Sequence, residues 1–369
     1  MLLGFENVAV AKLDLMLRVC HISPTYFAPE SLLGGGERFA EELSRAMSKV
    51  ANVRFVSYGP MALRTKPSDT FERVILRNWS PKKMTPFSPH LFSALRGADV
   101  IHCHQYYVFP TFLAAALGRV QGSRIFVTDL GGGGWTPGYH IDQSRWIAGH
   151  LPLSEYAARS LFGRPRPHRI IHGGVDLARY PMRGKLDHDG SVVFLGRLLP
   201  HKGVHYLIDA LPPGRTLHVL GPAPDLHYFE RLRLLAAGKD VRFKVGLSDT
   251  EVLEHLRHAM VLVHPTPVDH MGSAGANELF GLALVEAMAC GCPVIATRVA
   301  SLPEIVVHGE TGLLVPPNSP SDLCYAIEEI AKDDERWRRF AKAARRRVES
   351  QFTWDRVVTK CVEAYYEAL

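Results

Sequence analysis

The strongest constraint on this chain is its alternation of short β-branched runs with amphipathic helical patterns. One series of such runs fills the first half of the sequence, and a second series begins at Ser191. This alternation is typical of a parallel sheet covered by helices on both faces. A chain of 369 residues is longer than one hydrophobic core usually serves. We therefore expect an α/β protein with two doubly wound, Rossmann-like domains.

The runs predict four strands in the first sheet and five in the second. They lie at residues 15–22, 52–58, 99–104 and 124–129, and then at 191–196, 216–221, 241–246, 260–265 and 292–297. After the first strand and a glycine-rich loop, a helix is expected whose buried stripe is Phe39, Leu43, Met47 and Val50. Further helices are expected over residues 225–237, 249–258, 335–350 and 354–369.

A segment without periodicity separates the two series. Residues 177–189 are rich in Arg, Pro, Asp and Gly, as domain connections often are. We therefore expect a first domain over residues 1–176, in which 1–14 form an extension, and a second domain over 177–352. Residues 353–369 are expected to form a terminal helix that packs back toward the first domain.

Composition excludes several classes of protein. The hydrophobic content of 47% and charged content of 22% are those of globular proteins, and no run reaches the roughly 18 apolar residues of a membrane span. Glu6, Lys12 and Asp14 make a cleaved signal peptide a poor interpretation of the N-terminus. Six scattered cysteines indicate a reducing compartment, so a cytoplasmic location is expected. A net charge of +6 suits anionic partners in general.

The stretch from residue 277 to 296 carries the clearest chemistry. Its composition predicts a helix that starts just after Glu278 and stops at Gly291. The free amides of the first turn, around Gly281 and Leu282, would stabilise a phosphate group. Glu278 and Glu286 could accept hydrogen bonds from sugar or ribose hydroxyls. The stretch therefore predicts one end of a site for a phosphorylated sugar.

Two cations complete this constellation. Arg197 and Lys202 bracket the loop between the strand at 191–196 and a helix expected from Gly203. A guanidinium and an ammonium on one loop suit a diphosphate, and especially the charge that grows on a departing one. Taken singly, an acid pair or a basic loop is usually solvated surface; their joint occurrence in this order favours a site.

Together with these features, several motifs resemble the retaining family 4 glycosyltransferases of GT-B fold. They are the stretches 34–37, 99–104, 172–176, 196–203 and 278–286, and the resemblance covers nearly the whole chain. It implies two Rossmann-like domains that face a central cleft. The first would be the acceptor side, and the second would bind the nucleotide-sugar donor. It also implies a role in polysaccharide or glycolipid biosynthesis.

The resemblance implies a role for each candidate residue. Arg197 and Lys202 would hold the donor diphosphate, and Glu278 the donor sugar. Glu286 would bind the ribose, and Phe280, Gly281 and Leu282 would contribute backbone amides. Gly35 and Gly36 would close on the donor from the opposite domain. The implied reaction is retaining hexosyl transfer from a UDP- or GDP-sugar to a glycan, glycolipid or small-molecule acceptor. Neither a cofactor nor a metal is expected, and no nucleic acid.

The sequence departs from the family pattern in two places. Many relatives have a Thr-x-His sequence where this chain has Thr128, Asp129 and Leu130, so the usual histidine beside the donor sugar is missing. Asp129 or the glycines that follow could replace its contact, and His270, in a polar insertion, could reach the donor sugar. His102 and His104 alternate on a strand, which core packing explains. The acids at 187–189 are interpreted as a solvated linker and not as a metal site.

Two further hypotheses stay open. The missing histidine is compatible with a catalytically altered nucleotide-sugar-binding protein, and the fold is shared by sugar-nucleotide epimerases. Peripheral contact with an anionic membrane, on its inner face, would suit a lipid-linked acceptor. The basic residues for such contact would be Lys82, Lys83 and the arginines at 336, 338, 339 and 345–347.

Overall fold

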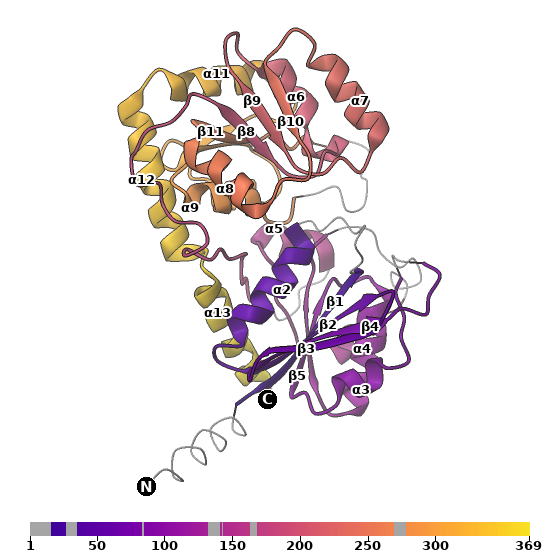
Figure 1. The fold of residues 1–369 in the computed structure, drawn as a ribbon. Coiled ribbons are helices and arrows are strands. Elements are labelled where there is room, and N and C mark those ends of the chain that lie inside the picture. The colour runs from indigo at the N-terminus through magenta and orange to yellow at the C-terminus, as the bar shows by residue number, and fades with distance from the viewer. Residues whose placement is uncertain are drawn as a thin grey trace. The chain divides into compact units, whose positions relative to one another are not determined.

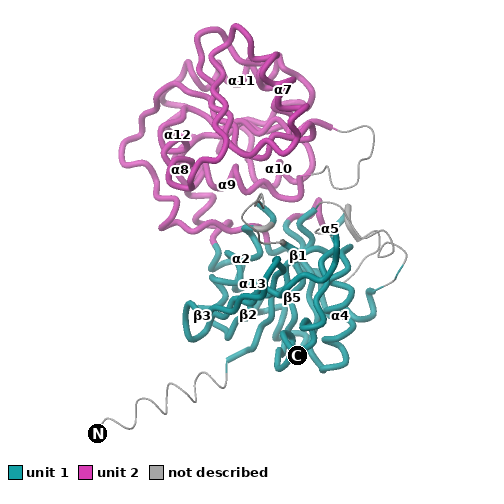
Figure 2. The backbone as a smooth tube through the Cα atoms, turned by 45° about the vertical axis from the view of Figure 1, so that its right-hand side comes forward, with its two compact units in different colours: residues 1–153, 158–171, 354–369 teal, residues 154–157, 172–353 magenta. Residues whose placement is uncertain are grey.

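In the computed structural model the chain forms two compact units, each built on its own sheet (Figures 1 and 2). The structure describes residues 16–26, 35–82, 85–131, 141, 143–162, 168–268 and 278–369. The first unit comprises residues 1–153, 158–171 and 354–369, and the second comprises 154–157 and 172–353. Apart from the short stretch 154–157, the chain thus enters the second unit after Ile171, whereas the sequence placed the boundary at Asp176, and it returns after Thr353. The predicted two-domain α/β architecture is confirmed.

The sheet of the first unit has the order β3-β4-β2-β1-β5-β6-β7. Every pair in it is parallel except the β3–β4 hairpin. The strands are β1 Arg18–Tyr26, β2 Asn52–Gly59, β3 Leu63–Ser68, β4 Phe71–Arg77, β5 Val100–His104, β6 Arg124–Thr128 and β7 Gly149–His150. The four predicted strands are β1, β2, β5 and β6. All six residues of β3 are exposed, so that strand has no alternation from which it could be predicted.

Helices cover both faces of this sheet. They are α2 Gly35–Met47, α3 Leu91–Leu95, α4 Phe109–Val120 and α13 Trp354–Ala368, whereas α5 Glu155–Phe162 spans the boundary between the two units. On α2, Phe39, Leu43 and Met47 are fully buried, as predicted. Val50 was wrongly placed in this stripe, because α2 ends at Met47 and Val50 lies exposed in the turn that follows. Figure 1 shows α13 beside α2, where Trp354 packs against Phe39.

The sheet of the second unit is wholly parallel, with the order β10-β9-β8-β11-β12-β13. Its strands are β8 Val192–Leu195, β9 Leu217–Leu220, β10 Val241–Lys244, β11 Val261–His264, β12 Val294–Thr297 and β13 Gly312–Val315, and only β13 was not predicted. The order runs outward in one direction from β8 and in the other direction from β11. A doubly wound sheet binds its ligands where the order reverses, beyond the carboxyl ends of the strands. That point lies between β8 and β11.

The helices of the second unit pack around this sheet (Figure 1). They are α6 Val204–Ala210, α7 Leu226–Leu235, α8 Asp249–His258, α9 Leu282–Ala289, α10 Leu302–Ile305, α11 Pro320–Ala331 and α12 Asp334–Gln351. The α8 helix has the bounds that the sequence predicted, and Ser248 and Glu251 form a capping box at its start. Trp337 anchors α12 in the core, where its indole nitrogen donates to the Met260 carbonyl at 2.7 Å. None of the described helices is long and apolar enough to cross a bilayer.

Candidate functional site

The loop after β8 is pressed against the end of β11. Gly203 sits between the short 3-10 turn Pro200–Lys202 and α6, in the left-handed region at φ 71°. A Cβ atom at this position would lie 1.9 Å from the Pro265 carbonyl oxygen, so only glycine fits. This close approach holds Lys202 beside the end of β11, at the point where the strand order reverses.

Lys202 forms an ion pair with Glu278 there. The Lys202 Nζ atom lies 2.5 Å from Glu278 Oε2, and both side chains are mostly buried, with exposed fractions of 18% and 13%. Burial by itself would raise the pKa of Glu278, but Lys202 and then His264 lower it well below its usual value. Glu278 is therefore an ionised carboxylate, and its Oε2 atom is held by both Lys202 and His264. The predicted meeting of these two segments is present in the structure.

The segment that carries Glu278 is fixed through its backbone. The hydroxyl of Ser301 donates to the carbonyl oxygens of Glu278 and Phe280 at 2.8 and 3.0 Å. The hydroxyl of Ser154 donates to the Leu279 carbonyl at 2.8 Å. The ring of Phe280 is buried against Gly173, where an added Cβ would meet it at 2.4 Å. Glu278 thus projects from a rigid segment.

The α9 helix begins directly after this segment, at Leu282 and not immediately after Glu278. Gly281 is its N-cap and adopts φ 108°, and a Cβ there would lie 3.1 Å from Leu302. The first amides of a helix have no partner inside it and carry its positive dipole end. The start of α9 can therefore bind an anion close to Lys202 and Glu278.

Glu286 lies one turn into α9 and is buried. The hydroxyl of Tyr180 donates to its Oε1 atom at 2.9 Å. The sequence pointed to Glu286 but not to Tyr180, since the two are 106 positions apart and no spacing links them.

Arg197 is exposed, and its side chain has no hydrogen bond or ion pair within the described part of the chain. Burial, followed by the charges of Lys202 and Arg197, lowers the pKa of His201 to about 4. Both cations therefore act on the same short turn, as the sequence predicted, and Arg197 has a guanidinium available for a ligand.

In the first unit, Gly36 and Leu130 are neighbours. A Cβ at Gly36 would lie 3.4 Å from the Cβ of Leu130, so the expected glycine-rich segment meets the position of the missing histidine. Gly35 is exposed at the first position of α2. Asp129 is buried, which raises its pKa, and its carboxylate accepts from the Gly131 backbone at 2.9 Å. His270 lies outside the described residues.

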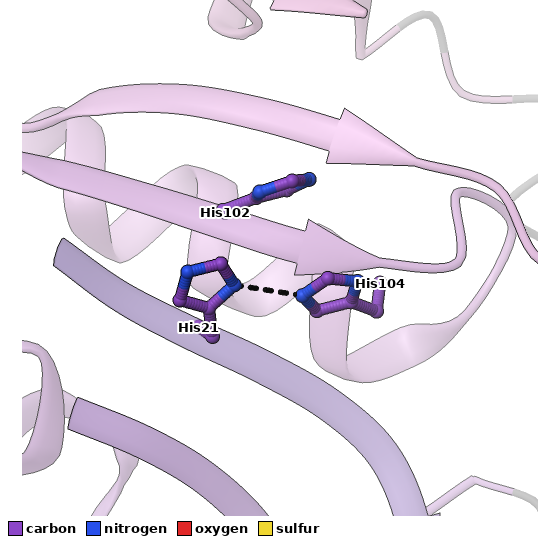
Figure 3. Close-up of side chains that lie close together, drawn as sticks. All are labelled: His21, His102 and His104. Carbon is purple, nitrogen blue, oxygen red and sulfur yellow. Dashed lines mark hydrogen bonds between the residues drawn. The ribbon is translucent and has the colours of Figure 1, made fainter. Parts of the chain in front are cut away.

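One group of described residues has the spacing of a metal site: His21 on β1, and His102 and His104 on β5 (Figure 3). One ring nitrogen from each lies within 4.8 Å of the others. Burial lowers the pKa of all three, that of His21 to about 3, so the rings are neutral. Neutral imidazole is also the form that binds metals. The hydrogen bonds decide between the two interpretations.

Both nitrogens of His102 are engaged. The Thr128 hydroxyl donates to the Leu151 carbonyl at 2.8 Å, so it accepts from His102 Nε2–H at the same distance. The Tyr365 hydroxyl lies 2.7 Å from His102 Nδ1 and donates to it. His21 and His104 bond to each other at 2.9 Å, drawn as the dashed line in Figure 3. We interpret the group as a neutral, hydrogen-bonded cluster in the sheet.

Family models match both halves of the chain. Residues 183–347 match the model described as "Glycosyl transferases group 1", and residues 33–179 match "Glycosyltransferase Family 4".

Two relatives and one solved structure illustrate the similarity. A glycogen synthase of Mycobacterium tuberculosis is 30% identical over 304 residues, 73% of this chain and 69% of that protein. The GDP-mannose-dependent alpha-(1-6)-phosphatidylinositol monomannoside mannosyltransferase of the same organism is 32% identical over 224 residues, 55% of this chain and 57% of that protein. The Anabaena protein HepE in complex with UDP-glucose has a similar fold, with a TM-score of 0.73 at 18% identity over 95% of this chain and 100% of HepE.

Proposed function

The chain belongs to the glycosyl transferases group 1, of GT-B fold, and is a glycosyltransferase; we propose that it uses a UDP- or GDP-linked hexose as its donor. The hexosyl group would pass, with retained anomeric configuration, to a glycan, a glycolipid or a small-molecule acceptor. The donor class is supported by the relatives, since one is named GDP-mannose-dependent and a structural neighbour holds UDP-glucose.

The observation that carries the proposal is the Lys202–Glu278 ion pair at the point where the strand order reverses. An ammonium group has three N–H donors, so Lys202 can keep one bond to Glu278 and give another to a phosphate oxygen. Arg197 and the first amides of α9 would bind the remaining oxygens of the diphosphate. As the bond to the sugar breaks, charge grows on the diphosphate, and these fixed donors stabilise it.

In this proposal Glu278 and Glu286 bind the parts of the donor other than the diphosphate. Glu278 lies beside Lys202, which would bind the diphosphate, and would accept hydrogen bonds from sugar hydroxyls near the reacting carbon. Glu286, held by Tyr180, would accept from the ribose. We assign no covalent nucleophile, and the donor phosphate would take the proton of the acceptor hydroxyl.

We propose that the reaction needs no metal and takes place in the cytoplasm. Arg197, Lys202 and the helix amides supply the positive charge that a metal ion gives the diphosphate in other transferases. Transfer should therefore persist in excess EDTA. A loss of activity on chelation that Mg²⁺ or Mn²⁺ restores would contradict this part of the proposal.

Contact with anionic lipid remains a separate proposal, for a lipid-linked acceptor. The arginines of α12 would contribute less to it than the sequence suggests. Arg345 donates to the Tyr180 and Ala289 carbonyls, and Arg347 to those of Glu304 and Ile305. Co-sedimentation with vesicles of phosphatidylglycerol and phosphatidylcholine, compared with phosphatidylcholine alone, tests the contact directly.

The central experiment is a nucleotide panel on the intact protein. UDP, GDP and ADP are compared by thermal shift, because a ligand that binds only the folded state raises Tm with its saturation. We expect one nucleotide to raise the Tm of the wild type and to leave the Tm of Lys202→Met unchanged. The matching nucleotide sugar should then be hydrolysed slowly without acceptor. Binding by neither protein, or by both alike, would refute the proposed site, and conversion of the donor to its epimer would indicate an epimerase.

A further inference from the structure

The last residue of β11 is a buried histidine that sequence reasoning overlooked. His264 is 4% exposed, and its ring lies between Thr266 and Glu278. The Nδ1 atom is 2.9 Å from Thr266 Oγ1, and the Nε2 atom is 3.3 Å from Glu278 Oε2. The imidazole therefore connects a threonine hydroxyl to the carboxylate of the donor site.

The proton positions on this ring follow from its two neighbours. An ionised carboxylate only accepts hydrogen bonds, so Nε2 must carry a proton for the contact with Glu278 to be favourable. In a neutral imidazole the other nitrogen is then an acceptor, and the Thr266 hydroxyl donates to it. Thr266 is itself buried, and its carbonyl accepts from the Thr297 hydroxyl at 2.6 Å. The Glu278 carboxylate thus fixes a proton on Nε2, and the Thr266 hydroxyl holds the ring through Nδ1.

The two donors to Glu278 Oε2 differ in stiffness. Lys202 reaches it through a flexible four-carbon stem, whereas His264 is a short side chain fixed at the end of a buried strand. A donor diphosphate would share the Lys202 ammonium with Glu278, so Lys202 adjusts its position when the donor binds. The bond from His264 ties Oε2 to the sheet independently of that adjustment.

We propose that His264 is a positioning residue of the donor site: its Nε2–H holds Glu278 Oε2 in place while Lys202 engages the diphosphate, and the Thr266 hydroxyl holds the ring through Nδ1. His264 does not touch the donor in this proposal and acts only through Glu278. The inference rests on the proposed function, because it assumes that Glu278 binds the donor sugar.

Four variants test the proposal. His264→Leu removes both ring bonds, and His264→Asn can imitate only Nδ1. His264→Gln places an amide N–H about where Nε2–H lies, and Thr266→Val removes the hydroxyl at nearly constant shape. The assays are kcat with UDP-glucose or GDP-mannose, whichever the wild type uses, affinity for the matching nucleoside diphosphate, and Tm.

We expect kcat to fall about 10- to 100-fold in His264→Leu and His264→Asn, because small displacements of a binding group cost that much. His264→Gln should stay within about 3-fold of the wild type, since it keeps the donor to Glu278. Diphosphate affinity should change less than about 2-fold in all of them, because UDP and GDP lack the sugar that Glu278 would bind. If His264→Leu and His264→Gln lose kcat equally, and in proportion to their loss in Tm, the proposal is overturned. Full activity in His264→Leu would also overturn it.

A spectroscopic measurement separates this inference from the proposed function. Nitrogen NMR of the labelled protein should show a proton on His264 Nε2, and Thr266→Val, which removes only the partner of Nδ1, should leave that proton in place. A ring protonated on Nδ1 alone would overturn the inference whatever the activity. If the wild type transfers no sugar from any nucleotide, the proposed function fails, and the proton position on His264 then tests the contact with Glu278 by itself.

Discussion

The phenol of Tyr180 donates a hydrogen bond to Glu286 Oε1 across 2.9 Å. Tyr180 lies shortly after the chain enters the second unit, and Glu286 lies in the middle of α9. Both side chains are buried, so the bond is made where water does not compete. Its effect is to orient the carboxylate that we assign to the ribose.

Tyr180→Phe should weaken both the fold and nucleotide binding. The fold loses a hydrogen bond to a charged group, about 1.5–3 kcal/mol, and the carboxylate assigned to the ribose loses its orientation, so we expect UDP or GDP affinity to fall roughly 10-fold. Calorimetric titration with the nucleotide measures this. Tyr228→Phe is the matched control, because the hydroxyl of Tyr228 bonds to His205 and to none of the site residues. The same loss in both variants would indicate a general effect of removing a buried phenol.

Arg197→Ala should lower kcat with little change in the fold. The exposed guanidinium has no partner in the described residues, so its loss leaves no orphaned group in the protein. Removing one fixed donor to a departing oxyanion typically costs about 100- to 1,000-fold in kcat. Steady-state transfer assays measure the effect. Arg233→Ala, which breaks an exposed pair with Glu230 on α7, is the control and should leave kcat unchanged. Wild-type turnover in Arg197→Ala would remove its assigned role.

The fold was largely predictable because parallel strands buried on both faces are continuous apolar runs. Four of the strands β8 to β12 have buried runs of this kind, and all five were found from the sequence. The wholly exposed strand β3 has no such signal, and β13 is only four residues long. Val50 was misjudged because helical spacing continues past Met47 while the helix itself does not.

The candidate site was only partly predictable, for a different reason. Lys202 and Glu278 stand out because a basic loop and a helix start follow strands that a doubly wound sheet brings together. His264 could have been noticed, since it ends the strand at the point where the order reverses. Tyr180 carries no local signal, because its role depends on a contact made only in the folded unit. Pairing of His21 with His104 depends likewise on strand register.

Mild acid should destabilise the first unit through its histidine cluster. Burial lowers the pKa of His21, His102 and His104 in the folded state, whereas in the unfolded chain each titrates near 6.5. The unfolded state therefore binds more protons below pH 6.5. The contribution of the cluster is complete above that pH and is lost as the pH falls, by up to about 1.4 kcal/mol per pH unit per histidine.

Hydrogen exchange of the β1 and β5 amides between pH 7.5 and 5, corrected for intrinsic exchange rates, measures this dependence. His104→Gln removes one titrating ring, so the slope of the opening free energy against pH should fall by the equivalent of about one proton. His90→Gln removes an exposed histidine of the same unit and should not. Equal slopes in the wild type and His104→Gln would contradict the explanation. Zinc or copper retained in stoichiometric amounts through chelation would show that the cluster binds metal.

Gly203→Ala should disrupt the site, whereas Gly214→Ala should not. Both glycines have positive φ, 71° and 76°, so alanine at either position costs about 1–2 kcal/mol of backbone strain. A Cβ at Gly214 has nothing within 4 Å, but one at Gly203 would lie 1.9 Å from the Pro265 carbonyl oxygen. Relieving that overlap must move the loop that carries Lys202 away from the end of β11.

We therefore expect Gly203→Ala to lose more unfolding free energy than Gly214→Ala and, in addition, about 10-fold or more in UDP or GDP affinity. Urea unfolding and calorimetric titration of the two variants give both quantities. The comparison separates the effect of the overlap with Pro265 from that of backbone strain, because both variants carry the strain and only Gly203→Ala has the overlap. If the two variants bind nucleotide equally well, the position of Lys202 does not depend on the contact between Gly203 and Pro265, and the local basis proposed for the Lys202–Glu278 pair is wrong.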